Sequence, residues 1–384
     1  MKTFRFSLKK YRNYLIAAAL LLIFLALDLL GVLKRTDANL LTQIAISMIL
    51  AVSLNLVVGF LGELSLGHAG FMCVGAYIGG YAAVALRGAI GSGIVVLLLS
   101  VVIGGLAAAL AGFVIGVPTL RLKGDYLAIV TLAFGEIVRT VFRNQATFGG
   151  ALGLDTSSVK FGTKLYIPAL LLVLLTLFVV QNLMDSKHGR AIKAIRDSEI
   201  AARTSGIAVT KYKLTVFVIA AFFAGIAGVV YAHHTSPVDY GYFSFNTSID
   251  ILVMVVLGGM GNITGTLLSA AALTFIDVKL TTALSLDAAV RNLIYALILI
   301  LLVVWNNAPA LRRVREKYNL GALWTRLSRR LFPKKAEEDS ESAAWDKIPT
   351  KIPMDAILST DMQPDRAFTP DRPGQEGKGG EPRE

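Results

Sequence analysis

The sequence predicts an all-α fold, a polytopic bundle of about nine membrane-spanning helices, some of them broken by glycine, since roughly 20 apolar residues cross a bilayer. Hydrophobic residues make up 55% of the 384 residues, and the mean hydropathy is +0.63. Apolar runs of spanning length recur along the chain, and two of them are interrupted by glycines and polar residues. So much apolar surface excludes a soluble domain of this size.

The apolar runs predict the helices in chain order. They cover residues 15–33, 40–61, 66–86, 94–117, 126–142, 165–184, 214–232 and 293–305. The interrupted run 249–276 completes the set. The first run follows a basic N-terminus, as in a signal peptide, but it is long enough to span and no small-residue cleavage pattern follows it. We therefore expect an uncleaved first span.

Basic residues predict the orientation of the helices. The formal net charge is +12, and the Lys and Arg residues gather in blocks between apolar runs, which is typical of cytoplasmic loops rather than of a nucleic-acid site. An N-terminus in the cytoplasm places Arg121, Lys123 and the basic stretch 187–213 on the cytoplasmic side. It places the connection 232–248, which has no Lys or Arg, outside.

The interrupted run 249–276 is predicted to re-enter the membrane. As one ordinary span it would leave the basic sequence LRRVREKYN, which begins at Leu311, outside. We expect the run to enter the membrane, break at 258–261 and return to the same side, so that the span 293–305 returns the chain to the cytoplasm. Both chain ends then lie in the cytoplasm.

The run 56–81, LVVGFLGELSLGHAGFMCVGAYIGGY, contains the other interruption. Unwound backbone at membrane depth persists only where protein or a water-filled cavity lines it. GFLGELS from Gly59 and GGMGNIT from Gly258 share a pattern of glycine, polar, aliphatic and hydroxyl residues, which is either an internal repeat or a chance match. Paired glycine interruptions indicate a transport site, whereas glycines that only permit close helix packing are the alternative. The predicted pathway and gate residues are Gly59, Gly62, Glu63, Ser65, Gly67, His68, Gly258, Gly259, Gly261, Asn262 and Thr264.

The segment 189–213, GRAIKAIRDSEIAARTSGIAVTKYK, lies between two predicted spans. It is helix-prone, with an apolar edge at Ile192, Ile195 and Ile200 and charged residues opposite. Gly206 is a helix stop. The segment is either an interfacial helix held on anionic lipid or a docking helix for a soluble partner.

Four ordered motifs carry a resemblance to a known family. They are SLNLVVGFLGELSLGHAGF from Ser53, GDYLAIVTLAFGEIVR from Gly124, GRAIKAIRDSEIAARTSGI from Gly189 and VVLGGMGNITG from Val255. Together they resemble the branched-chain amino-acid ABC transporter permease family of the LivM type, over residues 45–275. One residue more separates Glu199 from Gly206 than in other ABC permeases, so contacts are not transferred from those proteins.

The resemblance implies a permease subunit of an ATP-driven importer for branched-chain amino acids, which works by alternating access in the bacterial cytoplasmic (inner) membrane. It implies three kinds of partner: a homologous second permease, two ATP-binding subunits and an extracytoplasmic substrate-binding protein. Membrane lipid is a further partner, expected from the composition of the chain. Coupling to the ATPases is expected at Arg190, Ile192, Arg196, Asp197, Glu199 and Gly206. A urea or short-amide permease fits the same motifs.

We expect no enzyme activity in this chain. The sequence has no GxxxxGK[ST] phosphate loop, and its nearest fragment, GQEGKGG from Gly374, has the wrong spacing. The partner ATPases are therefore expected to bind ATP and magnesium. No cofactor, metal site, catalytic residue or nucleic-acid partner is predicted, and the single cysteine, Cys73, excludes an internal disulfide.

Charged and titratable residues in the apolar runs leave another class of transporter open. An ion-coupled secondary transporter needs an intramembrane relay, for which Glu63, His68 and Asp250 could serve. His68 either satisfies a backbone carbonyl or carries protons. Glu136 and Arg139, one helical turn apart, predict a structural ion pair, with a gating role as the alternative.

Three domains are predicted. Residues 1–309 form the permease domain, which includes the coupling segment 189–213. Residues 310–333 have apolar and basic residues at helical spacing, which predicts an amphipathic cytoplasmic helix on an anionic membrane face. Residues 334–384 are rich in Pro, Gly, Asp and Glu, which predicts a disordered cytoplasmic tail.

Overall fold

The computed structural model describes residues 35–119, 122, 124–283, 297 and 300, all within one compact unit of the chain, residues 1–308. The described part is helical, apart from loops and one isolated β-bridge between Leu154 and Val238. Several predicted features lie outside the described residues. They are the span 15–33, Arg121, Lys123, the basic helix 310–333, the tail 334–384 and the span 293–305, of which only residues 297 and 300 are described.

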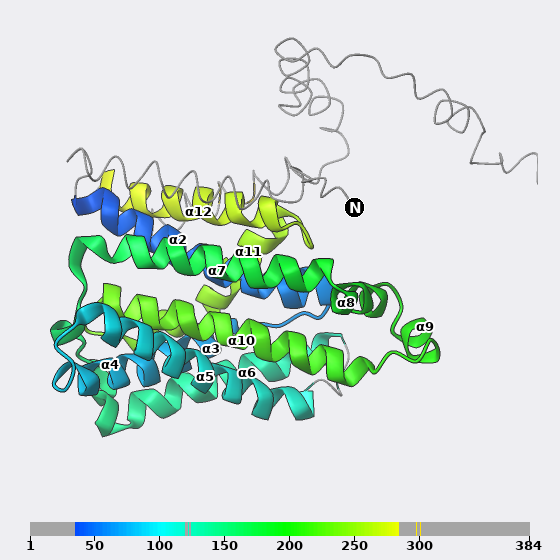
Figure 1. Cartoon of the computed structure of the whole chain (residues 1–384), viewed down its shortest axis with the longest axis horizontal. Coiled ribbons are helices and arrows are strands. Elements are labelled where there is room, and N and C mark those ends of the chain that lie inside the picture. The colour runs from blue at the N-terminus through cyan, green and yellow to red at the C-terminus, as the bar shows by residue number, and fades with distance from the viewer. Residues whose placement is uncertain (1–34, 120–121, 123, 284–296, 298–299, 301–384) are drawn as a thin grey trace, which may run out of the picture. The chain divides into compact units, whose positions relative to one another are not determined.

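Five helical stretches in the described part are long and apolar enough to cross a membrane (Figure 1). The first, Arg35–Leu61, is made of α2 (Arg35–Asn55) and the π-helical η1 (Leu56–Leu61). The second, His68–Arg87, is made of α3 (His68–Val74), the π-helical η2 (Gly75–Gly79) and α4 (Gly80–Arg87). The other three are α5 (Gly93–Thr119), α7 (Tyr166–Asp185) and α10 (Val209–His234). Each coincides with a predicted run. The all-helical fold is therefore confirmed, while a total of about nine spans stays a prediction.

The predicted interruption in 56–81 is a non-helical connection, residues 62–67, between η1 and α3. Gly62 begins this connection with a φ of 83°, a left-handed conformation that glycine adopts without steric cost. The helix resumes at His68. The break therefore separates two long helices and leaves each of them continuous.

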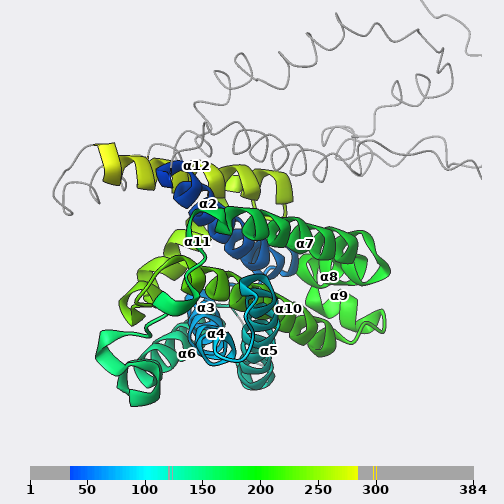
Figure 2. The same cartoon turned by 60° about the vertical axis from the view of Figure 1, so that its left-hand side comes forward.

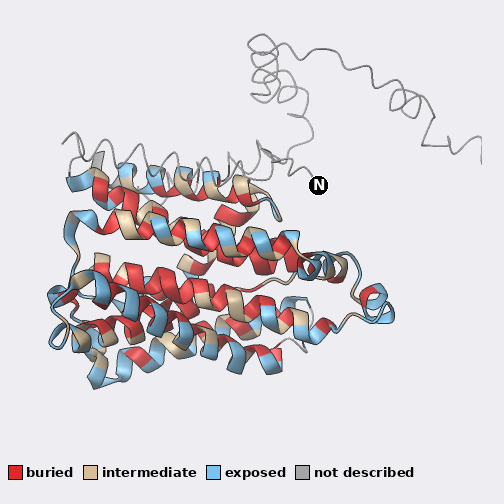
Figure 3. Cartoon of the chain, viewed as in Figure 1, coloured by how far each residue is buried: buried red, intermediate tan, exposed pale blue. Residues whose placement is uncertain are grey.

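The central helix of the bundle is α10, and Figure 3 shows that it is buried over much of its length. It packs against α5 and against the α3–η2 segment. Glycine permits these contacts, because a Cβ on Gly75 would overlap the backbone of Gly225, and one on Gly225 would meet Ala108. Small residues at crossings let helices approach closely in a membrane. Gly75 and Gly225, which lie outside the two predicted breaks, therefore have a packing role.

The interrupted run 249–276 forms a helical hairpin. Helix α11 (Phe245–Gly258) ends at the predicted break, Gly259 and Gly261 have φ values of 91° and 79°, and α12 (Ile263–Ala283) returns antiparallel to it. Helix α12 lies beside α2 in both views (Figures 1 and 2). The position of the break is confirmed, and re-entry into a membrane stays a prediction.

Ion pairs and hydrogen bonds fix the direction of this hairpin against α2. Lys279 pairs with Asp37 at the start of α2, with 3.7 Å between Nζ and Oδ1. At the other end of α2, Asn55 Nδ2 donates to Thr266 Oγ1 at 3.0 Å. The two helices are therefore antiparallel, and the break lies level with the end of α2.

Two short helices project from this end of the bundle, which we call the α8 end (Figure 1). They are α8 (Lys187–Asp197) and α9 (Glu199–Thr204). The sequence predicted one helix here, but Ser198 is extended and its hydroxyl oxygen accepts the N–H of Ala201, which caps α9. Gly206 ends the segment with a φ of 80°, as predicted.

The opposite end, which we call the far end, holds the loops. The remaining long helix, α6 (Asp125–Asn144), leads into them. Short 3₁₀ turns then follow: η3 (Ala146–Phe148), η4 (Gly150–Leu152), η5 (Ser157–Val159), η6 (Gly162–Leu165) and η7 (Tyr240–Phe243). The Leu154–Val238 bridge and the hydrogen bond from Tyr77 Oη to the Val238 carbonyl join these loops to the helices.

Candidate functional site

The two predicted glycine breaks meet at the α8 end. The side chain of Asn55, fully buried in α2, joins them: Oδ1 accepts the Gly261 N–H at 2.9 Å, while Nδ2 donates to Thr266. A Cβ on Gly59 would overlap both Asn55 Oδ1 and the Gly261 nitrogen. Glycine at 59 therefore allows the break of α11–α12 to rest on η1, and we call this contact the junction.

Arg196 attaches α8 to the junction. Its Nη1 donates to the Gly59 carbonyl oxygen at 3.2 Å, and its aliphatic stem covers Gly62, where a Cβ would lie 2.8 Å from Arg196 Cγ. Nε and Nη2 donate to Asp197 Oδ1 at 3.2 and 3.1 Å, which orients the guanidinium. The predicted coupling residue Arg196 and the predicted gate residues Gly59 and Gly62 therefore form one contact.

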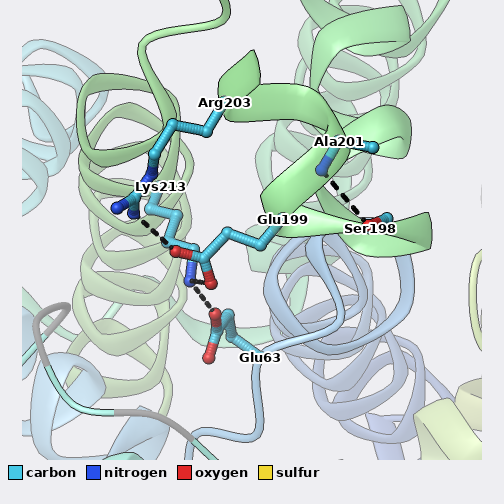
Figure 4. A network of polar contacts seen from close by, with 6 residues as sticks. All are labelled: Glu63, Ser198, Glu199, Ala201, Arg203 and Lys213. Carbon is cyan, nitrogen blue, oxygen red and sulfur yellow. Dashed lines mark hydrogen bonds and ion pairs between the residues drawn. The ribbon is translucent and has the colours of Figure 1, made fainter. Parts of the chain in front are cut away.

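A buried ion cluster makes a second attachment (Figure 4). Lys213 of α10 is 3% exposed, and its ammonium lies between the carboxylates of Glu63 and Glu199, the latter at 3.2 Å. Glu199 also accepts from Arg203 Nη2 at 2.9 Å. The cluster has two carboxylates and two cations, so each charge that is removed from water has a partner of opposite sign. The cluster ties the 62–67 connection to α9 and α10.

His68 lies deeper in the bundle and is 2% exposed. Its Nε2 is 2.8 Å from Ser53 Oγ, which itself donates to the Leu50 carbonyl at 2.9 Å. The ring also hydrogen-bonds the backbone of Leu50, which is the backbone-carbonyl role that was one of the two alternatives from the sequence.

The other predicted gate residues lie in the 62–67 connection and at the break between α11 and α12. Gly67 approaches the backbone of Thr131, whose hydroxyl accepts the Leu66 N–H at 3.0 Å. Gly258 lies against the backbone of Thr266, and Asn262 Oδ1 accepts the Gly265 N–H at 3.2 Å at the start of α12. Three more were predicted: Ser65 is buried, Gly259 caps α11, and Thr264 lies in the first turn of α12.

The remaining coupling residues divide into a buried and an exposed set. Ile192 and Ile195 are buried under α8, as the apolar edge predicted, whereas Arg190 and Asp197 are exposed. Ile200 departs from the predicted edge, because it is 76% exposed on α9. The break at Ser198 turns α9 relative to α8, so the edge does not continue.

A groove of about 520 Å³ lies next to α8. Its lining includes Leu183, His188, Ile192, Ile207 and Tyr212. His188 Nδ1 is 3.3 Å from Tyr212 Oη, which holds the start of α8 against α10. The α8 end thus offers a partner a groove, exposed cations and one exposed isoleucine.

Sequence reasoning missed Asn55, Ser53 and Lys213. Asn55 and Ser53 lie within an apolar run, and polar side chains in such runs indicate interhelical hydrogen bonds, which was the available signal. The partners of Asn55 could not be read from the pattern, because Gly261 and Thr266 come more than 200 residues later in the chain, at separations of 206 and 211. The predicted ion pair of Glu136 and Arg139 is confirmed at 3.3 Å.

Comparison with known proteins gives a family match over residues 37–303, to the family described as branched-chain amino acid transport system / permease component. The chain is 36% identical over 282 residues to the high-affinity branched-chain amino acid transport system permease protein LivM of Salmonella typhimurium, an alignment that covers 62% of each chain. It is 36% identical over 309 residues to the Escherichia coli protein of the same name, with 70% of this chain and 68% of that one covered.

More distant relatives are named for a different transported substrate, ribose. The chain is 27% identical over 295 residues to the ribose import permease protein RbsC of Escherichia coli, with 73% of this chain and 85% of that one covered. The aligned part spans less than two thirds of the Salmonella protein. No solved structure matches the chain.

Proposed function

The chain belongs to the family of permease components of branched-chain amino acid transport systems, and from this premise we propose that it is the transmembrane permease subunit of an ATP-driven importer for branched-chain amino acids. An extracytoplasmic binding protein delivers the substrate, and the permease passes it on by alternating access. The 36% identity to the LivM proteins, against 27% to the ribose permeases, supports an amino acid over a sugar as cargo.

The proposed assembly has a homologous second permease and two ATP-binding subunits. ATP and Mg²⁺ bind to those subunits, in keeping with a sequence that has no GxxxxGK[ST] motif. The complex lies in the bacterial cytoplasmic membrane. The α8 end faces the cytoplasm because its exposed Lys and Arg residues follow the positive-inside rule, and the far end faces outside.

The observation that carries the proposal is the contact between Arg196 and the junction. A subunit that moves α8 pulls on the Gly59 carbonyl through Arg196, and it pulls on the 62–67 connection through Glu199, Lys213 and Glu63. Both attachments lead to the place where the two glycine breaks meet. Discrete rearrangement of packed elements at such a contact is how a displacement becomes a change of access.

Docking of the ATPases is assigned to the exposed surface of α8 and α9. Ile200 is 76% exposed there, the groove beside His188 can accept a side chain of the partner, and Arg190 and Lys193 offer positive charge. A large apolar side chain surrounded by charge is typical of an interaction surface.

The test is reconstitution of the chain with its co-purifying subunits in proteoliposomes. We expect uptake of L-leucine that requires both ATP and the binding protein. Uptake by this chain alone, indifferent to ATP and driven by a proton gradient, would show a secondary transporter instead. Urea, acetamide and D-ribose are supplied in parallel, each with its own binding protein, because uptake of one of them instead of leucine would reassign the cargo.

A further inference from the structure

A cavity of about 640 Å³ lies between α2, α11, α12 and the end of α10. It falls outside the predicted gate residues, and its volume is within the roughly 300–1,000 Å³ of small-molecule sites. On α2 it is lined by residues between Gln43 and Leu50. Because α2 runs from the far end to the α8 end, these residues place the cavity on the far side of the junction.

The cavity is polar toward the far end and apolar toward the junction. Gln43, Asn246 and Asp277 line it in the halves of α2, α11 and α12 that lie toward the far end. Leu50 and Met254, about two turns farther along α2 and α11, line its inner part. This arrangement suits a ligand with a charged end and an aliphatic end.

Two polar groups among the lining residues have no hydrogen-bond or ion-pair partner that the described residues supply. Thr274 is 8% exposed, and its Oγ1 has no hydrogen-bond partner in the described part of the chain. A buried hydroxyl without a partner is costly, and most such groups in proteins are paired. Asp250, half-buried on the neighbouring helix α11, also lines the cavity and forms no ion pair with any cation among the described residues. A carboxylate in this position has no cationic partner, and a positively charged ligand can supply one.

We propose that this cavity is the passage site for the free amino acid: the α-ammonium group binds the Asp250 carboxylate, Thr274 Oγ1 donates to the α-carboxylate, and the branched side chain packs against Leu50 and Met254. The inference rests on the proposed function and extends it to particular atoms. Charge-assisted hydrogen bonds hold the ammonium group, and they are about twice as strong as neutral ones. The apolar inner part of the cavity accommodates the aliphatic side chain, because Leu50 and Met254 present no polar group to it.

The position of the cavity relative to the junction fits alternating access. One turn beyond Leu50, Ser53 bonds His68, and Asn55 bonds Gly261 soon after. Both bonds lie on the α8 side of the cavity floor. A site on one side of a closed junction is what a transporter needs before the junction opens.

The first test compares Asp250→Asn with Asp125→Asn, an exposed acidic residue at the start of α6, in the full reconstituted complex. ATP-driven uptake of L-leucine is expected to fall at least about tenfold in Asp250→Asn, as loss of one charged contact predicts. Asp125→Asn is expected to stay within about twofold of the unaltered complex, the range of ordinary surface substitutions. Equal uptake by the two variants overturns the proposal. An unaltered complex that takes up no leucine refutes the proposed function instead, before any variant is compared.

The second test measures the cavity directly and does not depend on Asp250→Asn folding. Ser47 lines the cavity and is replaced by cysteine in a Cys73→Ala background, which leaves one thiol. We expect a cationic thiosulfonate to label this thiol from the far side, and L-leucine or 3-methylbutylamine to slow the labelling. 4-Methylpentanoate, which lacks the ammonium group, is expected to leave the rate unchanged. No labelling, as in a cavity filled by lipid, or no protection by leucine, contradicts the proposal.

Discussion

The Nη1 of Arg196 donates a hydrogen bond to the carbonyl oxygen of Gly59 at 3.2 Å, although 137 residues separate the two. The same guanidinium group lies next to Gly261, where a Cβ would be 3.4 Å from Nη1. One side chain of α8 therefore contacts η1 and the break between α11 and α12. A displacement of α8 changes the surroundings of both breaks at once.

Arg196→Gln is expected to uncouple transport from ATP hydrolysis. Glutamine keeps polar character but cannot hold both the Gly59 carbonyl and Asp197 as the guanidinium fork does. We expect leucine uptake per ATP hydrolysed to fall about tenfold, corresponding to a loss of about 1.4 kcal/mol in coupling. Lys187→Gln, an exposed change at the first residue of α8, is the control. The assignment fails if Arg196→Gln and Lys187→Gln give the same ratio of uptake to hydrolysis while both complexes stay assembled.

Lys213→Met is expected to destabilise the permease. The lysine side chain is 4% exposed and the Glu63 side chain 13% exposed, so the substitution leaves a carboxylate without its cation in a buried place. Removal of one partner of a buried pair costs about 3–5 kcal/mol. The measurement is thermal unfolding of the complex in detergent, with Lys211→Met, at an exposed position two residues earlier, as the control.

A combined variant separates charge from packing at the same site. Glu63→Gln together with Lys213→Met removes the stranded carboxylate, so part of the lost stability is expected to return. Recovery in the double variant is the signature of paired charges. If the double variant is as unstable as the sum of the two single ones, Glu63 and Lys213 do not act as a pair.

Gly59→Ala is expected to separate the two breaks. The added Cβ overlaps Asn55 Oδ1 and the Gly261 nitrogen, so the junction must open or η1 must shift. Such overpacking typically costs about 1–3 kcal/mol. Gly91→Ala meets no atom within 4 Å and is the matched control. Unfolding midpoints and leucine uptake are compared for the two variants, and unchanged values for Gly59→Ala would speak against a closed junction.

The far-end loops are expected to loosen in acid. The Asp155 carboxylate accepts from the Ser157 N–H at 2.9 Å and from Ser236 Oγ at 3.1 Å, and these hydrogen bonds hold its pKa below the ordinary value. Since the folded-state pKa lies below the unfolded-state value, this contribution is complete above the unfolded pKa. It is lost as the pH falls through the folded one.

Hydrogen exchange of residues 155–159 and 235–238 between pH 6 and pH 3 measures this change, about the range in which a carboxylate with a lowered pKa titrates. The exchange rate, corrected for its intrinsic pH dependence, is expected to rise at the acid end. Asp155→Asn removes the titrating group, so its corrected rate is expected to be independent of pH. A rise of equal size in Asp155→Asn would assign the loosening to another group.

The sequence predicted the helices well because an apolar run is a local property. Runs such as 94–117 and 165–184 coincide with α5 and α7, whose ends differ from the predicted ones by a few residues. Glycines predicted both breaks for the same reason, since Gly62 and Gly259 have left-handed backbone conformations that other residues adopt at a cost. The motifs resembling the LivM-type permeases predicted the family.

Local pattern failed where a neighbouring residue changed the path of the chain. Ser198 splits the expected coupling helix in two because its side chain caps α9, and Ile200 then faces solvent. A serine within a helix-prone segment can cap a helix or sit inside one, and the sequence does not separate these cases.

By itself, the sequence determined which residues form helices, where the backbone breaks and which segment carries the basic charge, since these depend on neighbours a few positions away. The tertiary structure alone decided that the two breaks touch, that Asn55 joins them and that Arg196 and Lys213 connect them to α8 and α9. The physical reason is that a hydrogen bond or ion pair acts over about 3 Å in space, whereas these partners lie far apart along the chain. Only the packing of α2 against α10, α11 and α12 brings them within reach.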